Sequence, residues 1–246
     1  MDAKIKQVII NSPYDEPNQY WRYNRDRKDF DLTEGRRPSG YFVARKNSKN
    51  DDEGVFIELE LVNRIRPRVR EWRMNDYPEV TDMTRRLIHH WNDRNVRPDT
   101  PFFFCQLDAI ETLIFLSETH EGKNILIPDD GSTFRRICTK LCTGGGKTIV
   151  MAMLIAWQVC NAVSYPRDKR FTKNILIVSP NLTVKRRLGV LKSGGANYYD
   201  KFEIIPPEIR YFLSRAKIEI CNWQMFLSEK ADVKSVVKIP PKSDDA

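Results

Sequence analysis

The segment that most constrains the fold runs from Phe134 to Val163. Phe134–Leu141 has the composition of a short strand and leads into a glycine-rich loop, Cys142–Gly146. Lys147–Val163 is largely apolar over a length that predicts a core helix. A strand, a glycine-rich turn and a helix in that order are typical of α/β proteins, in which the helix N-terminus presents free N–H groups. The order therefore predicts an α/β fold built around this loop.

The loop and the start of the helix read Thr143-Gly144-Gly145-Gly146-Lys147-Thr148. Three glycines allow backbone conformations that other residues avoid and let the N–H groups approach an anion closely. The positive end of the helix dipole points at the same place. We expect Lys147 to reach the β- and γ-phosphates of ATP, and the Thr148 hydroxyl to coordinate Mg²⁺. The pattern predicts ATP and Mg²⁺ as cofactors, with Lys147 and Thr148 as the catalytic groups.

One position departs from the strict phosphate-loop pattern, because Leu141 stands where that pattern begins with glycine. Helicase-type loops often relax this position, so the departure favours a helicase over a kinase or a GTPase. The alternative is a glycine-rich turn that binds nothing. Lys147 and Thr148 directly after the glycines, with a strand before and a helix after, argue against that alternative.

The segments around the loop predict a parallel sheet. Asn174–Ser179 is short and nearly all apolar, as expected for a strand buried on both faces, and Lys217–Cys221 is a further candidate. Leu182–Leu191 is the expected helix between them, and Phe103–Thr119 is expected as a helix before the loop. Alternating strands and helices predict right-handed crossovers in a parallel sheet.

Residues 1–100 differ in composition from the rest, being dense in charge, proline and asparagine. An arginine-rich helix is expected at Leu61–Trp72, kinked or divided by Pro67. Its arginines lie two apart and so point to different faces, which favours solvation and local ion pairs over DNA binding. The other expected elements are β-like runs at Tyr41–Arg45 and Gly54–Leu59, a loop at Asn47–Gly54, and a helix at Asp82–Trp91 capped by Thr81.

The charge balance permits a phosphate-rich partner. The 246 residues contain 41 Lys and Arg against 33 Asp and Glu, a formal net charge of +8. The five cysteines contain no C-x-x-C pair, which predicts buried free thiols and argues against a zinc site. The N-terminal residues lack a secretory signal, and the apolar run Ile149–Trp157 is too short to span a bilayer. A cytoplasmic protein without membrane contact is expected.

A series of ordered segments resembles the restriction (Res) subunit of type III restriction–modification enzymes and the related DEAD/DEAH-box proteins. The resemblance covers roughly Asn11 to Phe226. The segments that carry it are Asn11–Asn24, Gly35–Val43, Asn63–Arg73, Val80–Trp91, Phe102–Glu118, Lys140–Gln158, Ile175–Leu191 and Ile218–Phe226.

The resemblance implies a P-loop RecA-like parallel sheet with flanking helices in residues 101–246, truncated before the acidic motif that holds Mg²⁺. Residues 1–100 would be a mixed α/β accessory region. The acidic groups Asp51–Glu53 and Asp244–Asp245 follow no apolar strand and are rejected as that motif. The intact protein is expected to be a superfamily 2 helicase that couples ATP hydrolysis to movement along duplex DNA, with a DNA methyltransferase as a further partner and endonuclease activity if it is a restriction subunit.

The resemblance also implies roles for single residues. Gln106 corresponds to the glutamine that reads the adenine edge, with an ordinary polar helix residue as the alternative. A DNA-contacting motif follows the second strand, and for each side chain in it a solvated basic helix turn is the equal alternative. Asn222 follows the last strand at a further DNA-facing position. The nucleic-acid candidates are Thr183, Lys185, Arg186, Arg187 and Asn222.

Two other functions stay open. One is a non-catalytic module that binds nucleotide or DNA and regulates a partner. Such a module would not need the acidic motif that holds Mg²⁺ for hydrolysis. A stand-alone P-loop kinase is disfavoured by Leu141 and by the lack of a lid region that binds the acceptor.

Overall fold

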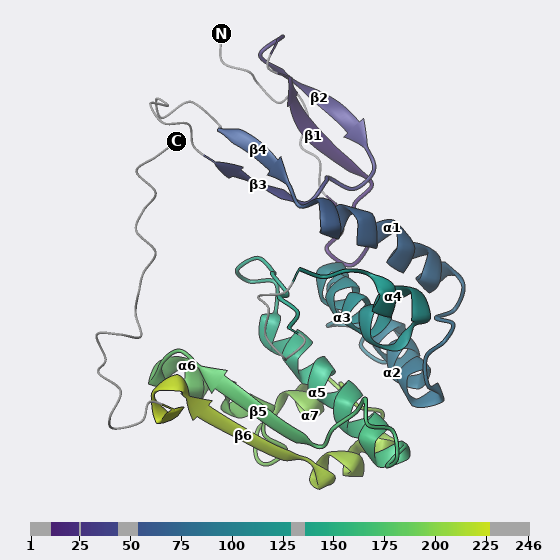
Figure 1. The fold of residues 1–246 in the computed structure, drawn as a ribbon, viewed down its shortest axis with the longest axis vertical. Coiled ribbons are helices and arrows are strands. Elements are labelled where there is room, and N and C mark those ends of the chain that lie inside the picture. Colours follow the sequence, from purple (N-terminus) through teal and green to yellow (C-terminus); the bar gives the residue numbers. More distant parts are fainter. Residues whose placement is uncertain (1–10, 25, 44–53, 129–135, 227–246) are drawn as a thin grey trace.

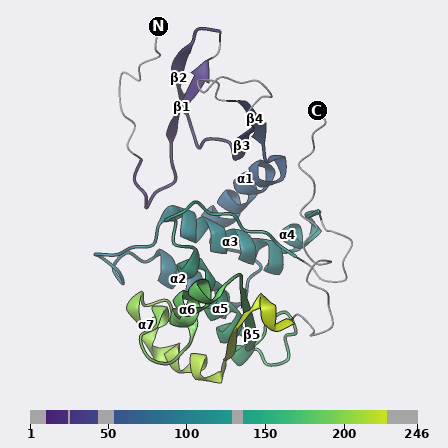
Figure 2. The ribbon, with the colours of Figure 1, turned by 90° about the vertical axis from the view of Figure 1, so that its left-hand side faces the viewer.

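The computed structural model describes residues 11–24, 26–43, 54–128 and 136–226. Two β-ribbons lie at one end, a group of helices lies in the middle, and a small parallel sheet lies at the other end (Figure 1). The perpendicular view shows the same order along the long axis (Figure 2). Several expected features fall outside the described residues: the loop at 47–53, the acidic groups Asp51–Glu53 and Asp244–Asp245, and the start of the strand expected at Phe134.

The two ribbons are antiparallel pairs of short strands. β1 (Gln19–Asn24) pairs with β2 (Asp29–Glu34), and β3 (Gly40–Val43) pairs with β4 (Val55–Glu58). The β-like runs expected around Tyr41 and Gly54 correspond to β3 and β4. The first ribbon was not expected, because charged residues interrupt its apolar pattern at Arg22, Asp29 and Asp31.

α1 (Glu60–Met74) runs continuously through Pro67, so the expected division of this helix is wrong. Proline removes one helical hydrogen bond, but buried side chains on both sides of it, Ile65 and Val69, hold the helix against the core. The ion pairs expected for its arginines are confirmed: Arg68 with Glu121, Arg70 with Glu16, and Arg73 with Asp108 and Glu111.

The other central helices follow the expected pattern closely. They are α2 (Asp82–Asn92), α3 (Phe104–Glu118), the short α4 (His120–Asn124) and α5 (Lys147–Ser164). The Thr81 side chain accepts a hydrogen bond from the Thr84 N–H and so caps α2 as predicted. α5 is long and apolar enough to cross a membrane by length and composition, but 56% of it is buried inside the protein, as in a core helix.

The far end holds β5 (Asn174–Ser179) and β6 (Lys217–Asn222), which pair in parallel from Asn174↔Lys217 to Ser179↔Asn222. The helix expected at Leu182–Leu191 is α6 (Leu182–Arg187) followed by a 3-10 turn, Leu188–Leu191. The remaining elements are α7 (Tyr198–Lys201) and 3-10 segments at Pro207–Arg215 and Trp223–Phe226.

The predicted fold class is confirmed only in its coarse form, a mixed α/β structure. Among the described residues the one parallel sheet has two strands, and no RecA-type parallel sheet is present. Residues 136–141, the described part of the third expected strand, have no regular secondary structure. Cys138, Thr139 and Lys140 are exposed there, whereas a central parallel strand needs side chains that can be buried on both faces. The strand prediction is therefore wrong for these residues.

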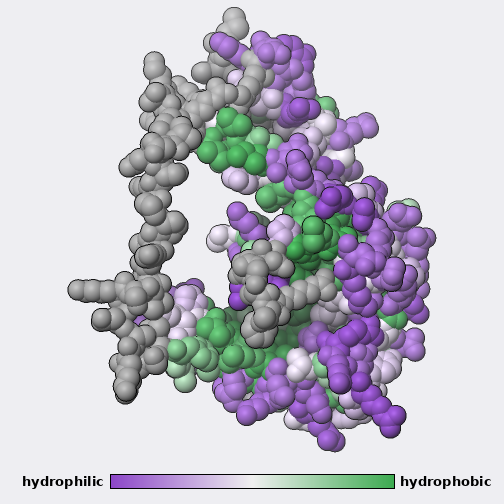
Figure 3. All heavy atoms as spheres, in the orientation of Figure 1, coloured by the Kyte–Doolittle hydropathy of each residue, from purple (hydrophilic) through white to green (hydrophobic). Residues whose placement is uncertain are grey.

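One hydrophobic core crosses residue 100. It joins Leu87 and Ile88 of α2 to Ile110 and Ile114 of α3, and it continues through α5 to both parallel strands. Ile177 and Ile220 face this core, while Leu176 and Val178 of β5 remain 58% and 49% exposed. Figure 3 shows apolar surface over the lower part of the molecule, where the parallel sheet lies.

His90 ties α2 to the segment before the second parallel strand, because its Nε2 lies 2.6 Å from the Glu203 carbonyl oxygen. Burial lowers the pKa of the His90 imidazole, and the nearby Arg97 guanidinium lowers that pKa further. The unfolded chain then binds a proton at a higher pH than the folded chain does. Stability due to His90 is complete above the ordinary histidine pKa and is lost as the pH falls below it.

We expect the free energy of unfolding in urea to fall between about pH 7.5 and about pH 5.5 because of His90. His90→Gln should flatten this slope, whereas His120→Gln, at an exposed position, should leave it unchanged. Equal slopes in wild type and His90→Gln would contradict the assignment.

Candidate phosphate-binding site

The predicted loop is a tight turn that leads directly into α5. The Gly145 N–H donates to the Cys142 carbonyl over 3.2 Å, and the Ile149 N–H donates to the Gly146 carbonyl over 2.8 Å. Gly144 and Gly146 have φ angles of +81° and +77°, in the left-handed region that favours glycine. The glycines at these two positions therefore adopt the backbone conformations that were expected of them.

The turn leaves backbone donors free at the start of a long helix. In the described part of the chain, the N–H groups of Gly146, Lys147 and Thr148 have no protein acceptor. α5 has 18 residues, so its full macrodipole adds positive potential at this end. Free N–H groups and a helix dipole at one point are the elements of an anion site.

Lys147 is exposed and folds back over its own loop. Its Nζ donates to the Cys142 carbonyl oxygen over 2.6 Å. The ammonium thus lies beside the turn, and a phosphate placed there would compete with one neutral carbonyl for it. Thr148, one residue further on, is half-buried in the first turn of α5. The contact with the Cys142 carbonyl could not be expected from the sequence, because a backbone acceptor leaves no trace in residue type.

Gln106, for which the resemblance implied contact with adenine, lies against the loop and makes its contacts to protein. It is 2% exposed; its Oε1 accepts from the Phe103 N–H over 3.0 Å, and its Nε2 donates to the Gly145 carbonyl over 3.3 Å. The side chain therefore joins the N-terminus of α3 to the glycine turn. A role for Gln106 in reading adenine stays a prediction.

Residues near Asn11–Pro17 cover the N-terminus of α3. The Phe104 N–H donates to the Pro13 carbonyl over 2.8 Å, and the rings of Tyr14 and Phe103 are 5.7 Å apart. Tyr14 was not expected at the site from the sequence; an aromatic residue within a turn-like SPYDEP segment was the available signal. This contact places an aromatic pair next to Gln106.

The cysteines near the loop are free thiols, but the expectation that they are buried holds only in part. Cys160 is buried, and burial raises the pKa of its thiol to about 12. Cys138 and Cys142 are exposed, because the segment before the loop is at the surface rather than in a strand. No group of three or more metal-ligating side chains occurs among the described residues.

The nucleic-acid candidates gather beyond the carboxyl ends of β5 and β6. The arrowheads of both strands and the N-terminus of α5 lie at the same end of the sheet layer (Figure 1). Trp223, after β6, donates from Nε1 to the carbonyl of Pro180, after β5, over 3.0 Å. The structure thus brings together two segments that are more than forty residues apart in the chain.

These candidates differ in exposure. Thr183, Arg186 and Arg187 of α6 are exposed, Lys185 is half-buried, and none of the three cations forms an ion pair with a described residue. Asn222 is only 5% exposed and hydrogen-bonds to Gln224. The exposed α6 side chains are accessible to a phosphate backbone, whereas Asn222 would first have to leave Gln224.

Comparison with protein-family models gave no matching family, and comparisons with curated proteins and with solved structures gave no similar protein.

Proposed function

We propose that this chain binds the phosphates of ATP with Mg²⁺ through residues Thr143–Thr148. The observation that carries the proposal is the glycine turn with free N–H groups at the start of α5, directly beside the Lys147 ammonium. Lys147 would move from the Cys142 carbonyl to the β- and γ-phosphates. Thr148 would place its hydroxyl toward Mg²⁺, which prefers oxygen ligands.

We further propose that the intact protein is a superfamily 2 motor related to type III Res subunits, which couples ATP hydrolysis to movement on duplex DNA. The support is the order of the motifs and the position of α6 at the same end of the sheet layer as the loop. Exposed cations on α6 would contact the phosphate backbone, which positions a protein on DNA without reading its sequence. A methyltransferase subunit is the partner that the resemblance implies.

The test is a titration of the chain with a fluorescent ATP analogue and Mg²⁺. Lys147→Ala removes a charged phosphate contact worth about 1.5–3 kcal/mol, so the affinity should fall about 10- to 100-fold. Lys140→Ala removes the same charge at an exposed position before the turn and should change the affinity less than about twofold.

Equal affinity for wild type and Lys147→Ala would exclude the proposed phosphate site. Phosphate release, followed with and without duplex DNA, separates the two classes of function. Binding of the ATP analogue without phosphate release would indicate a nucleotide-binding or regulatory module. Phosphate release that duplex DNA stimulates would indicate a motor.

A further inference from the structure

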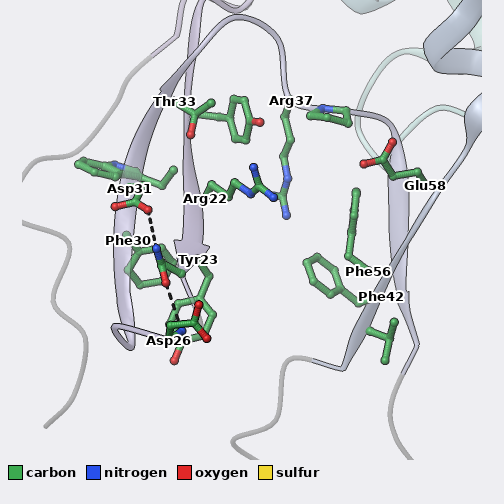
Figure 4. A pocket seen from close by; sticks show the side chains of 15 residues that line it. Arg22, Tyr23, Asp26, Phe30, Asp31, Thr33, Arg37, Phe42, Phe56 and Glu58 are labelled. Carbon is green, nitrogen blue, oxygen red and sulfur yellow. Dashed lines mark hydrogen bonds between the residues drawn. The ribbon is translucent and has the colours of Figure 1, made fainter.

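The groove between the two N-terminal ribbons has a volume of about 1200 Å³, and its charged and aromatic groups already compensate one another (Figure 4). Arg22 on β1 lies directly opposite Asp31 on β2 in the strand register. The Arg37 guanidinium lies 5.6 Å from the centre of the Phe42 ring and 5.7 Å from that of the Phe56 ring, and so covers the aromatic surface. A pair of reactive side chains that the proposed function does not use lies instead beside the glycine loop.

Two free thiols border one small space at the glycine turn. Cys105 lies in the first turn of α3, and Cys142 begins the turn that leads into α5. Their sulfur atoms lie 3.8 Å and 3.0 Å from a single point, the position that a Cβ on Gly145 would occupy. The two sulfur atoms are therefore no further apart than these two distances together. Since glycine has no Cβ, the space between the thiols is left open.

The two thiols differ in their access to solvent. Cys142 is exposed, whereas Cys105 is half-buried, with its sulfur 3.9 Å from the Gly145 carbonyl oxygen. Burial raises the pKa of the Cys105 thiol, and a negative charge on Cys142 raises that pKa further. An oxidant in solution therefore meets Cys142 first, while Cys105 stays protonated beside it. An accessible thiol next to a second thiol that can resolve it is typical of redox-sensing cysteines.

Cys142 is joined to the candidate phosphate site through its backbone. Its carbonyl oxygen accepts from the Gly145 N–H over 3.2 Å and from Lys147 Nζ over 2.6 Å. Cys105, by contrast, is held by α3, a helix of 15 residues that packs into the core. A disulfide of about 2.05 Å must therefore be closed by a movement of Cys142. That movement displaces the carbonyl and changes the shape of the turn that presents the free N–H groups.

We propose that Cys105 and Cys142 form a reversible disulfide that closes the phosphate-binding turn to ATP. The oxidant is hydrogen peroxide: the Cys142 sulfur attacks one oxygen atom, the O–O bond breaks, and Cys142 becomes a sulfenic acid. The Cys105 sulfur then attacks the Cys142 sulfur, so that the S–S bond forms and the sulfenic oxygen leaves. Each leaving hydroxide takes up one thiol proton and departs as water. Two thiols have then lost two electrons to one peroxide, and dithiothreitol reverses the reaction by thiol–disulfide exchange.

Peptide mapping of the full chain tests the disulfide independently of ATP. The protein is oxidised with hydrogen peroxide, its remaining free thiols are alkylated, and it is digested with trypsin and analysed by mass spectrometry. Trypsin places Cys142 in the peptide 141–147, Cys138 in 137–140 and Cys105 in 95–123. We expect peptide 141–147 to be linked to peptide 95–123 after oxidation, and to be released by dithiothreitol.

Cys138→Ser is the matched control, because it removes another exposed thiol close to Cys142 in the chain and should leave the linked peptides unchanged. Cys105→Ser should abolish them; serine keeps a hydroxyl beside the Gly145 carbonyl, and circular dichroism checks that the fold is unchanged. The proposal would be overturned if peptide 141–147 were linked to 137–140, or if Cys142 were alkylated as fully after oxidation as before it.

The effect on ATP rests on the function proposed for the loop and is measured separately. Oxidised wild type should bind the fluorescent ATP analogue at least about tenfold more weakly than reduced wild type, the loss expected when one charged phosphate contact is removed. Cys105→Ser should bind equally with and without peroxide. Equal binding by linked and reduced wild type would overturn the closing of the turn. If neither form bound the analogue, the function proposed for the loop would be wrong, while the linked peptides would still support the disulfide.

Discussion

Gly146→Ala is expected to abolish measurable binding of the ATP analogue. Gly146 has φ +77°, where an alanine costs about 1–2 kcal/mol relative to its preferred conformations. A Cβ there would also lie 3.1 Å from Cδ of Gln106 and would overlap Nε2. Because Gln106 is buried and bonded to both Phe103 and Gly145, it cannot move aside without loss of those hydrogen bonds.

The two effects add, since strain and steric overlap act on the same turn. Displacement of Gln106 would leave buried polar groups unsatisfied at about 1–3 kcal/mol. The loop of the variant would relax into another conformation. ATP binding would then have to restore the original conformation, and the affinity would fall by the free energy of the strain and of the lost hydrogen bonds together. A total of about 2–5 kcal/mol corresponds to a loss of affinity of about 30- to 5,000-fold.

Gly144→Ala and Gly189→Ala separate the causes. Gly144 has φ +81°, but no described atom lies within 4 Å of the methyl group that alanine would add, so only the strain remains and binding should fall about tenfold. Gly189 has neither a positive φ nor a close neighbour, and its alanine variant should bind as the wild type does. Equal binding by the Gly144 and Gly146 variants would show that the contact with Gln106 does not matter.

The same loop shows what the sequence could predict. The left-handed conformation at Gly144 and Gly146 and the helix that starts at Lys147 follow from local chemistry, so residue types were enough. The close packing of Gln106 on the turn depends on how α3 lies against α5, and only the motif resemblance pointed to that residue. The Lys147 contact with a backbone carbonyl could not be predicted from residue types at all.

Sequence patterns predicted helices better than strands in this chain. α2, α3 and α5 have long apolar stripes, and their bounds were correct within about two residues. The segment before the loop was misjudged because Ile137 and Leu141 resemble strand residues while Thr139 and Lys140 prevent burial on both faces. The groove between the ribbons was missed because it is formed by two hairpins, and the first hairpin lacks a clear alternating pattern.

The second large effect is expected from Glu118→Leu, in the centre of the helical layer. Glu118 is 3% exposed and accepts three hydrogen bonds: from the Trp157 Nε1–H at 2.7 Å, the Thr84 hydroxyl at 2.6 Å and the Thr81 N–H at 3.0 Å. These donors come from α5, α2 and the cap of α2, so one carboxylate on α3 joins three elements. Leucine keeps most of the volume but accepts none of these bonds.

We expect Glu118→Leu to lower the free energy of unfolding by about 2–4 kcal/mol, because the Thr84 hydroxyl and the Thr81 N–H lose this acceptor and the Trp157 Nε1–H keeps only the Thr84 hydroxyl, 3.1 Å away. The midpoint of thermal unfolding should fall by about 10 °C for a chain of this size. Glu118→Gln keeps an acceptor oxygen but places an NH₂ group against one of the donors, so it should cost about 1–2 kcal/mol. Urea unfolding followed by circular dichroism measures both variants, and equal m-values would show that the same surface unfolds.

Glu121→Ala provides the matched control on the neighbouring helix. Its carboxylate is 56% exposed and lies 3.2 Å from Arg68, so its removal should cost less than about 1 kcal/mol. A graded order of stability, with Glu121→Ala closest to wild type and Glu118→Leu furthest from it, would place the connection between α2, α3 and α5 at Glu118. If Glu118→Leu were as stable as Glu121→Ala, the apolar core around Ile110 and Trp157 would hold these helices together without the carboxylate.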